Sequence, residues 1–265
     1  MNKVNKYTLA DSLKGYHLIV SGFGLGFIGQ LTCDLLINNL NLSHHKHLDF
    51  ESICPIFGSD PYDNRQGEKV CATACQVYKS DQLKLAILMI RTRVIDFSVF
   101  QEEFKRFLDA NDFSSLFILC ASHFTNKDTE KRSGFFYLNA NDSKEIVFKQ
   151  LDIEEMKPLT SKDVGEDSEE IDSIVLPKAT KSYKLYKESS KRLNMYSCLL
   201  VLYPSGGLFT QQSQIFAEKI LELIPHQIGN VQNLESLKEK IEKTKWLQPS
   251  SWDSIQDNDI NSQIY

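Results

Sequence analysis

The fold of this protein is decided at residues 16–40, which read YHLIVSGFGLGFIGQLTCDLLINNL. The first six residues, Tyr16 to Ser21, are mostly apolar and predict a buried strand. A glycine-rich turn follows, and apolar residues then recur at helical spacing as far as Leu40. A strand, a tight turn and an amphipathic helix in this order predict an α/β protein.

The turn matches the pattern G-x-G-x-x-G of dinucleotide-binding proteins at three glycines, Gly24, Gly26 and Gly29. Such a site also needs an acidic residue after the next strand, about 20 residues on, to bind the ribose. Asp49 and Glu51 lie at that distance, but residues 41–48 before them form no hydrophobic strand. A turn that packs a helix tightly on a sheet explains the same glycines, and we predict no cofactor.

The rest of the chain continues the alternation of strands and helices. The predicted strands are 70–77, 83–92, 115–121 and 196–203, and the predicted helices are 96–110, 211–224 and 231–245. Residues 79–82 between the first two strands have turn chemistry, which indicates a hairpin. We therefore expect one three-layer α/β/α domain with a mixed sheet over residues 1–252, followed by a flexible tail, residues 253–265.

Two segments carry strong local charge. Residues 152–172 hold nine acidic residues and two lysines, a balance of -7, and predict a flexible surface loop. Residues 178–192 carry a balance of +5 at helical spacing. The plain interpretation of this basic segment is a solvated helix face, and an acidic partner surface is the alternative.

The composition excludes several classes of protein. A net charge of -5 over 265 residues argues against nucleic acid as a partner, because phosphate binding needs concentrated Lys and Arg. The chain has no apolar run of about 18 residues to span a membrane and no signal-peptide pattern, so we expect a cytoplasmic and nuclear protein. Reduced thiols acting as small core hydrophobes are predicted at Cys33, Cys54, Cys71, Cys75, Cys120 and Cys198.

The remaining candidates for chemistry are weak. Three histidines, His44, His45 and His47, suggest a metal site, but without partnered Cys or carboxylate spacing they predict a solvated turn. Residues 71 and 75 have no second metal-binding pair downstream. Ser122 and His123 are neighbours at a strand end and point to opposite sides, and the turn around Ser205 lacks the first glycine of a nucleophile elbow. We therefore predict no metal site and no enzyme activity.

Several short motifs, in order along the chain, resemble the proteasome assembly chaperone 2 family. The best defined are residues 26–37 (GFIGQLTCDLLI), which resemble the family's turn and G-Q-L-x-x-D-L helix, and residues 246–252 (WLQPSSW). Further matches are Leu40–Ser43, Gly58–Tyr62, Val77–Tyr78, Ile90–Arg91 and Ser122–His123. Ordered matches over nearly the whole chain are far harder to obtain by chance than one glycine motif.

This resemblance implies an α/β fold related to nucleoside phosphorylases without their catalysis. It also implies a heterodimer with proteasome assembly chaperone 1 that sits on the outer face of the 20S proteasome α-ring. There the family promotes assembly of α subunits and prevents premature regulator binding. The alternative is an enzyme, either nucleotide-binding or resembling a phosphorylase or hydrolase.

The C-terminal tail is the partner-binding element that the resemblance implies. Family tails enter pockets between α subunits, and the best-formed of them end in a hydrophobic residue, Tyr and any residue. This chain ends in Ile264 and Tyr265, so its tyrosine is last rather than penultimate. We expect this apolar-aromatic pair to anchor the tail, although it departs from the family pattern.

Overall fold

A computed structural model describes most of the chain, namely residues 13–62, 69–122, 134–139, 156–158, 179–192, 194–204, 208–228 and 245–254. Within this part, one eight-stranded mixed sheet has the order β2-β5-β6-β1-β7-β10-β8-β9. Its strands are β1 His17–Ser21, β2 Ser43–His47, β5 Cys75–Ser80, β6 Leu85–Ile90, β7 Ser115–Ala121, β8 Gly134–Asn139, β9 Met156–Pro158 and β10 Tyr196–Tyr203. A separate ribbon pairs β3, Phe57–Gly58, with β4, Ala72–Thr73.

The centre of the sheet is parallel and its flanks are mixed. β1 pairs in parallel with β6 on one side and β7 on the other, and β7 pairs in parallel with β10. β2, β5 and β6 form an antiparallel flank, and β8 joins β10 antiparallel on the other flank. The carboxyl ends of β6, β1, β7 and β10 therefore share one side of the sheet, called the carboxyl edge below.

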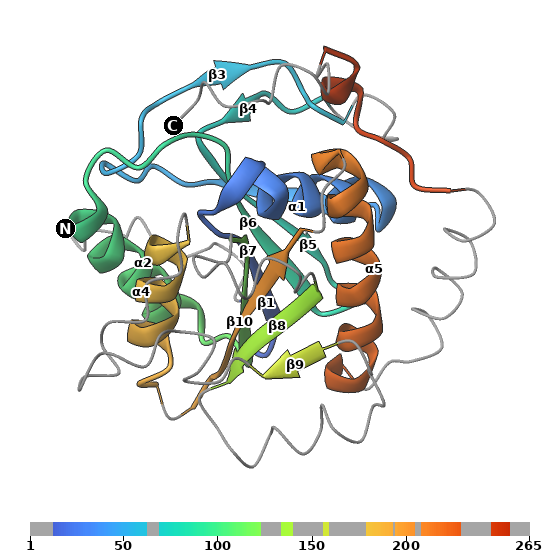
Figure 1. The fold of residues 1–265 in the computed structure, drawn as a ribbon. Helices are drawn as coiled ribbons and strands as arrows, with labels where there is room; N and C mark the ends of the chain where they lie inside the picture. The colour runs from blue at the N-terminus through green and yellow to red at the C-terminus, as the bar shows by residue number, and fades with distance from the viewer. Residues whose placement is uncertain are drawn as a thin grey trace.

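Two layers of helices cover the sheet, as Figure 1 shows. α1 (Ile28–Asn39) packs with α5 (Phe209–Ile228) on one face, and α2 (Phe97–Asn111) contacts α4 (Thr180–Ser189) on the other. Each face has its own buried apolar core. The predicted three-layer α/β arrangement is thus confirmed. Across the described residues, none of the helices combines the length and apolar character that crossing a bilayer requires.

Helix α2 shows how the local sequence builds one of these layers. Asp96 caps its N-terminus by accepting hydrogen bonds from the amides of Ser98 and Val99, at 2.9 and 3.1 Å. The aromatic row recurs at helical spacing and faces the sheet, with the Phe100 and Phe104 rings stacked 5.9 Å apart. Capping and apolar periodicity therefore place α2 within one residue of its predicted bounds, 96–110.

Most of the predicted elements are present. The strands predicted at 115–121 and 196–203 are β7 and β10, and the predicted hairpin is the antiparallel pair β5 and β6. Its turn lies at residues 81–84, slightly after the predicted position. The predicted strand 70–77 is divided between β4 and β5, and the predicted helix 231–245 lies almost wholly outside the described residues.

Two predicted loops contain strands instead. The polar histidine segment forms β2, which pairs antiparallel with β5 at the edge of the sheet. An edge strand needs no apolar residues on its outer side, so polarity does not prevent pairing. Met156–Pro158, inside the predicted acidic loop, forms β9 in parallel with β8.

Candidate functional site

The glycine-rich turn lies at the carboxyl edge, where a dinucleotide would bind, but protein atoms fill it. A Cβ atom on Gly24 would lie 2.6 Å from the Ala121 carbonyl oxygen, and one on Gly29 would lie 2.4 Å from that of Leu119. Gly26 has a left-handed backbone, with φ of 60°, and faces the Phe209 ring of α5. The glycines therefore allow close packing of the turn against β7 and α5.

The backbone amides at the start of the turn are also in use. The Gly22 amide donates to the Leu119 carbonyl at 2.8 Å, and the Phe23 amide donates to Ser182 Oγ of α4 at 2.7 Å. Ser182 Oγ in turn donates to the Phe23 carbonyl at 2.7 Å. These contacts confirm that the turn packs elements together, and β2 pairs far from β1, so the βαβ arrangement of a dinucleotide site is missing.

The cysteines are mostly buried thiols. Cys33, Cys75, Cys120 and Cys198 lie in the core, and burial raises the pKa of Cys120 to about 12. A thiol with such a pKa is a poor nucleophile at neutral pH. The prediction of core cysteines is wrong for Cys71, which is exposed, and Cys54 is half-buried.

The three histidines extend along β2 beside β5. A register shift between His44 and Lys46 brings the His44 and His47 rings together, with centroids 4.3 Å apart. His47 Nδ1 also lies 3.0 Å from Thr73 Oγ1. Within the part of the chain that the structure describes, no three His, Cys, Asp or Glu residues are arranged to hold a metal ion.

Of the other predicted positions, the structure describes Ser122. Ser122 is buried at the end of β7, where its amide donates to the Leu202 carbonyl at 3.0 Å. His123, Ser205, Ile264 and Tyr265 lie outside the described residues.

The short motifs that the sequence analysis quoted meet in one buried polar network. Tyr62 Oη donates to Asp34 Oδ1 of α1 at 2.5 Å and accepts from Arg91 Nη2 at 2.9 Å. Arg91 Nη1 closes the triangle with Asp34 at 3.1 Å. Tyr78 packs edge-on against Tyr62, with ring centroids 5.5 Å apart. Residues from four separate segments are thus joined at one point beneath the carboxyl edge.

This network is suited to holding structure rather than to catalysis. Tyr62 is 1% exposed and Asp34 6%, and their polar atoms bond to each other and to Arg91. Burial, and next the Asp34 carboxylate, raise the pKa of Tyr62 well above its usual value. The phenol therefore keeps its proton and remains a donor to Asp34.

The WLQPSSW motif is fastened to the same region. The side-chain Nδ2 groups of Asn38 and Asn39, near the end of α1, each donate to the Leu247 carbonyl at 2.9 Å. Ser250 Oγ donates to the Pro61 carbonyl at 3.2 Å, beside the network, and Trp252 is buried in the core. The motif thus holds the C-terminal segment on the body of the protein up to Ser254, where η5 (Ser250–Ser254) ends.

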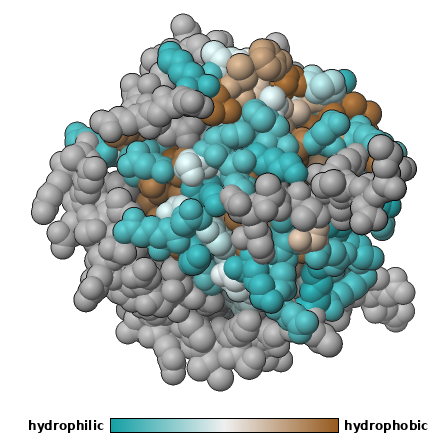
Figure 2. Space-filling model, turned by 180° about the vertical axis from the view of Figure 1, so that it is seen from behind, coloured by the Kyte–Doolittle hydropathy of each residue, from teal (hydrophilic) through white to brown (hydrophobic). Residues whose placement is uncertain are grey.

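Exposed apolar side chains cluster around the carboxyl edge. Six of them form what we call the apolar rim, namely Phe27, Ile56, Phe57, Ile95, Val99 and Leu208. Phe57, on β3, is the most exposed at 79%. Figure 1 shows the β3–β4 ribbon crossing above the carboxyl edge, and Figure 2 shows apolar surface along the upper part of the opposite view.

Backbone contacts bring the segments of the rim together. The Ile95 amide donates to the Ser52 carbonyl at 2.7 Å, and Ile53 forms a bridge with Val94, so the segment that precedes β3 lies beside the segment that follows β6. The Phe209 ring lies against Gly26, so the segments that carry Phe27 and Leu208 also pass close to each other. Exposed apolar groups of this kind mark surfaces for protein association. Sequence reasoning missed the rim because apolar spacing alone does not reveal which side chains remain uncovered.

Comparisons with known proteins agree with this picture, although no family model matches the chain. The chain is 26% identical to proteasome assembly chaperone 2 of Homo sapiens over 253 residues, which covers 92% of each protein. It is 29% identical to the protein of that name from Danio rerio over 46% of this chain and 48% of that protein. A solved archaeal homologue of proteasome-assembly chaperone, from Pyrococcus furiosus, has the same fold, with a TM-score of 0.53 and 14% identity over 89% of this chain and 87% of that one. The resemblance indicated by the motifs is confirmed.

Proposed function

We propose that this chain is a proteasome assembly chaperone subunit that acts by binding other proteins and catalyses no reaction. The observation that carries the proposal is its 26% identity with human proteasome assembly chaperone 2 across 92% of the chain. Assembly chaperone is a non-catalytic role. The filled glycine turn and the buried, mutually bonded Asp34, Tyr62 and Arg91 are consistent with it.

In finer detail, the chain pairs with a proteasome assembly chaperone 1-like subunit and binds the α-ring of the 20S proteasome in the cytoplasm and nucleus. There it promotes assembly of α subunits and keeps regulators from binding too early. The apolar rim supports pairing with the partner subunit, because dimer interfaces are more apolar than the remaining surface.

The experiment that tests this proposal is co-expression with a proteasome assembly chaperone 1-like subunit and proteasome α subunits. We expect a stable complex by size exclusion, with each chain identified by mass. If the chain formed no complex with either partner, the proposed function would be contradicted.

The C-terminal tail is the proposed anchor on the α-ring. Deleting Ile264 and Tyr265 should weaken ring binding by about tenfold, or about 1.4 kcal/mol, and leave pairing with the partner subunit unchanged. Ile255→Ser, in the same tail but away from its end, is the matched control. Equal ring affinity of the deleted and intact chains would contradict tail docking and leave the chaperone role intact.

The alternative enzyme is tested separately by thermal unfolding with NAD, NADP or nucleosides. A ligand that binds the native state raises its melting temperature by mass action. Because protein atoms fill the glycine turn, we expect no rise.

A further inference from the structure

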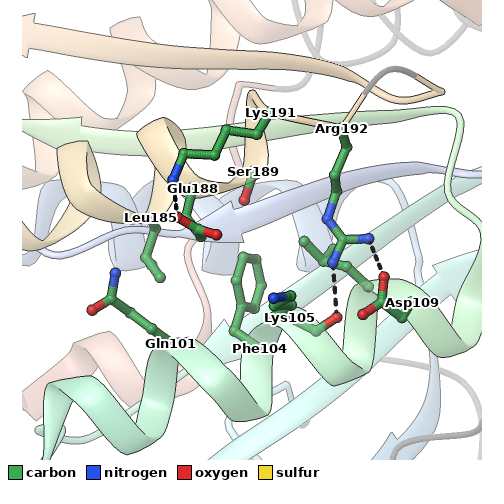
Figure 3. Close-up of a pocket in the computed structure, with 10 residues that line it drawn as sticks. Gln101, Phe104, Lys105, Asp109, Leu185, Glu188, Ser189, Lys191 and Arg192 are labelled. Atoms are coloured by element: carbon green, nitrogen blue, oxygen red, sulfur yellow. Dashed lines mark hydrogen bonds and ion pairs between the residues drawn. The ribbon is translucent and has the colours of Figure 1, made fainter.

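A groove of about 260 Å³ lies between α2 and α4. Its floor is apolar and buried, formed by Phe104, Leu108 and Leu185. Figure 3 shows the Phe104 ring standing between the two helices. Small-molecule sites usually measure about 300–1,000 Å³, so this groove suits one or two side chains better than a cofactor.

The carboxylates that line the groove are already paired. Arg192 Nη1 lies 2.6 Å from Asp109 Oδ1, and Lys191 Nζ lies 2.6 Å from Glu188 Oε2. Arg192 also donates to the Lys105 carbonyl at 3.0 Å, which ties the end of α4 to α2. The hydrogen bond from Lys191 lowers the pKa of Glu188, so this carboxylate is ionised at neutral pH.

The surface around the groove carries an excess of positive charge in a chain whose net charge is -5. Phe97–Asn111 and residues 180–192 supply seven cations, namely Lys105, Arg106, Lys181, Lys184, Lys187, Lys191 and Arg192. The same segments hold four carboxylates. Glu103 is buried, where it accepts hydrogen bonds from the Ser52 amide and hydroxyl, and the three that reach solvent are Glu102, Asp109 and Glu188.

Among the exposed cations, three have side chains with neither an ion pair nor a ring contact among the described residues; Lys181, by contrast, lies over the Phe23 and Phe97 rings. Lys105, Arg106 and Lys184 have no carboxylate at ion-pair distance among the described residues. Lys105 lines the groove itself, while Lys184 precedes the floor residue Leu185 on α4. The groove thus combines an apolar floor with one lining cation, Lys105, that has no ion pair among the described residues, and it lies between two helices whose exposed charge is mainly positive. Its complement is an acidic chain that carries an apolar residue.

We propose that the α2–α4 groove binds an acidic segment of a partner protein, with one apolar side chain of that segment seated over Phe104, Leu108 and Leu185. The proposal rests on the proposed function only in requiring a protein partner. A nucleic acid is disfavoured because the floor of the groove is apolar and offers no partner to a phosphate backbone.

The proposal is tested by fluorescence anisotropy with the full chain. The probe is a labelled synthetic peptide rich in Glu with Leu at helical spacing, and a second peptide has each Glu replaced by Lys. We expect the acidic peptide alone to bind, with an affinity that falls as salt is raised, because salt screens exposed charges.

Two variants locate the binding. Lys105→Glu with Lys184→Glu should weaken the acidic peptide by at least about tenfold, and Gln101→Trp should weaken it by filling the groove without changing its charge. The matched control is Lys219→Glu, on α5 in the other helical layer, which should bind the peptide normally.

Absence of peptide binding, or equal binding by the groove variants and the control, would overturn the proposal. Equal affinity for a short DNA duplex at the same salt would overturn the choice of a protein partner. Because the proteasome partners are assayed separately with the unaltered chain, failure here leaves the proposed function untouched.

Discussion

Asp34 is a buried charge that depends on two neighbours from distant segments. Its carboxylate faces the Arg91 guanidinium at 3.1 Å and the Tyr62 hydroxyl at 2.5 Å, and Arg91 is itself largely enclosed. Removing one partner of such a pair leaves the other charge buried and uncompensated, which costs far more than the pair contributes.

We therefore predict that Asp34→Ala lowers the free energy of unfolding by about 3–5 kcal/mol, measured by urea denaturation. The matched control is Asp109→Ala, which also breaks an Arg–Asp pair but at a site where the aspartate side chain is 59% exposed. That change should cost less than about 1 kcal/mol. Similar losses in the two variants would contradict the assigned role of burial.

His17 gives the fold a sensitivity to acid. It lies in β1 with Nδ1 2.7 Å from Ser115 Oγ, and burial lowers its pKa below the ordinary 6.5. The unfolded chain then takes up a proton at a higher pH than the folded chain does. The contribution of His17 to stability is therefore complete above pH 6.5 and is lost as the pH falls below that value.

We predict that His17→Gln shows a smaller loss of unfolding free energy between about pH 7.5 and pH 5.5 than the unaltered chain. The measurement is urea denaturation of the variant and of the unaltered chain at both pH values. The difference between the two proteins removes the contributions that the other titrating groups make to both. An unchanged pH dependence in the variant would show that His17 is not the cause.

At the scale of elements, the position of α1 depends on its close approach to β7. In a helix, alanine is normally more favourable than glycine by about 1 kcal/mol of free energy. From the sequence alone, Gly29 in α1 is therefore expected to be destabilising. The structure reverses this, because a Cβ on Gly29 would lie 2.4 Å from the backbone oxygen of Leu119.

Gly29→Ala should therefore destabilise the fold by about 1–3 kcal/mol, as overpacking does, despite its favourable helix propensity. The control is Gly58→Ala, because a Cβ on Gly58 meets nothing within 4 Å. Thermal unfolding of both variants checks the prediction, and a gain in stability for Gly29→Ala would refute the close packing.

The elements differ in how well their sequences predicted them. β7, β10 and α2 have strong apolar periodicity, and their bounds agree with the prediction within a residue. β2 could not be predicted because its sequence, SHHKH, has no strand pattern, and its pairing partner β5 lies about 30 residues further along the chain. Long-range pairing, rather than local propensity, makes this segment a strand.

For the whole molecule, the apolar rim and the α2–α4 groove offer two surfaces of different chemistry. The rim is apolar and surrounds the carboxyl edge, while the groove has a basic border on the helical layer of α2 and α4. Such a division allows one chain to contact two different proteins at once.

We predict that Phe57→Ser weakens pairing with the partner subunit by at least about tenfold and leaves the free energy of unfolding within about 0.5 kcal/mol. Leu247→Ser is the matched control, because Leu247 is also exposed, at 57%, but lies outside the rim. Sedimentation or size exclusion of the mixed subunits measures the effect. Equal losses of pairing in both variants would argue against the rim.

The α/β class, the main strands and helices, and the packing role of the glycine turn could be predicted from the order of the residues alone. These follow from local periodicity and residue type, which a single segment carries within itself. The likeness to proteasome assembly chaperone 2 was also readable from ordered motifs along the chain.

The folded protein was needed to establish the strand order, the strand β2, and the network that joins Asp34, Tyr62 and Arg91. It also decided which apolar side chains stay uncovered and which cations lack a partner among the described residues. Burial and ion pairing depend on segments that are distant in the chain and meet only in the folded protein, so no local pattern encodes them.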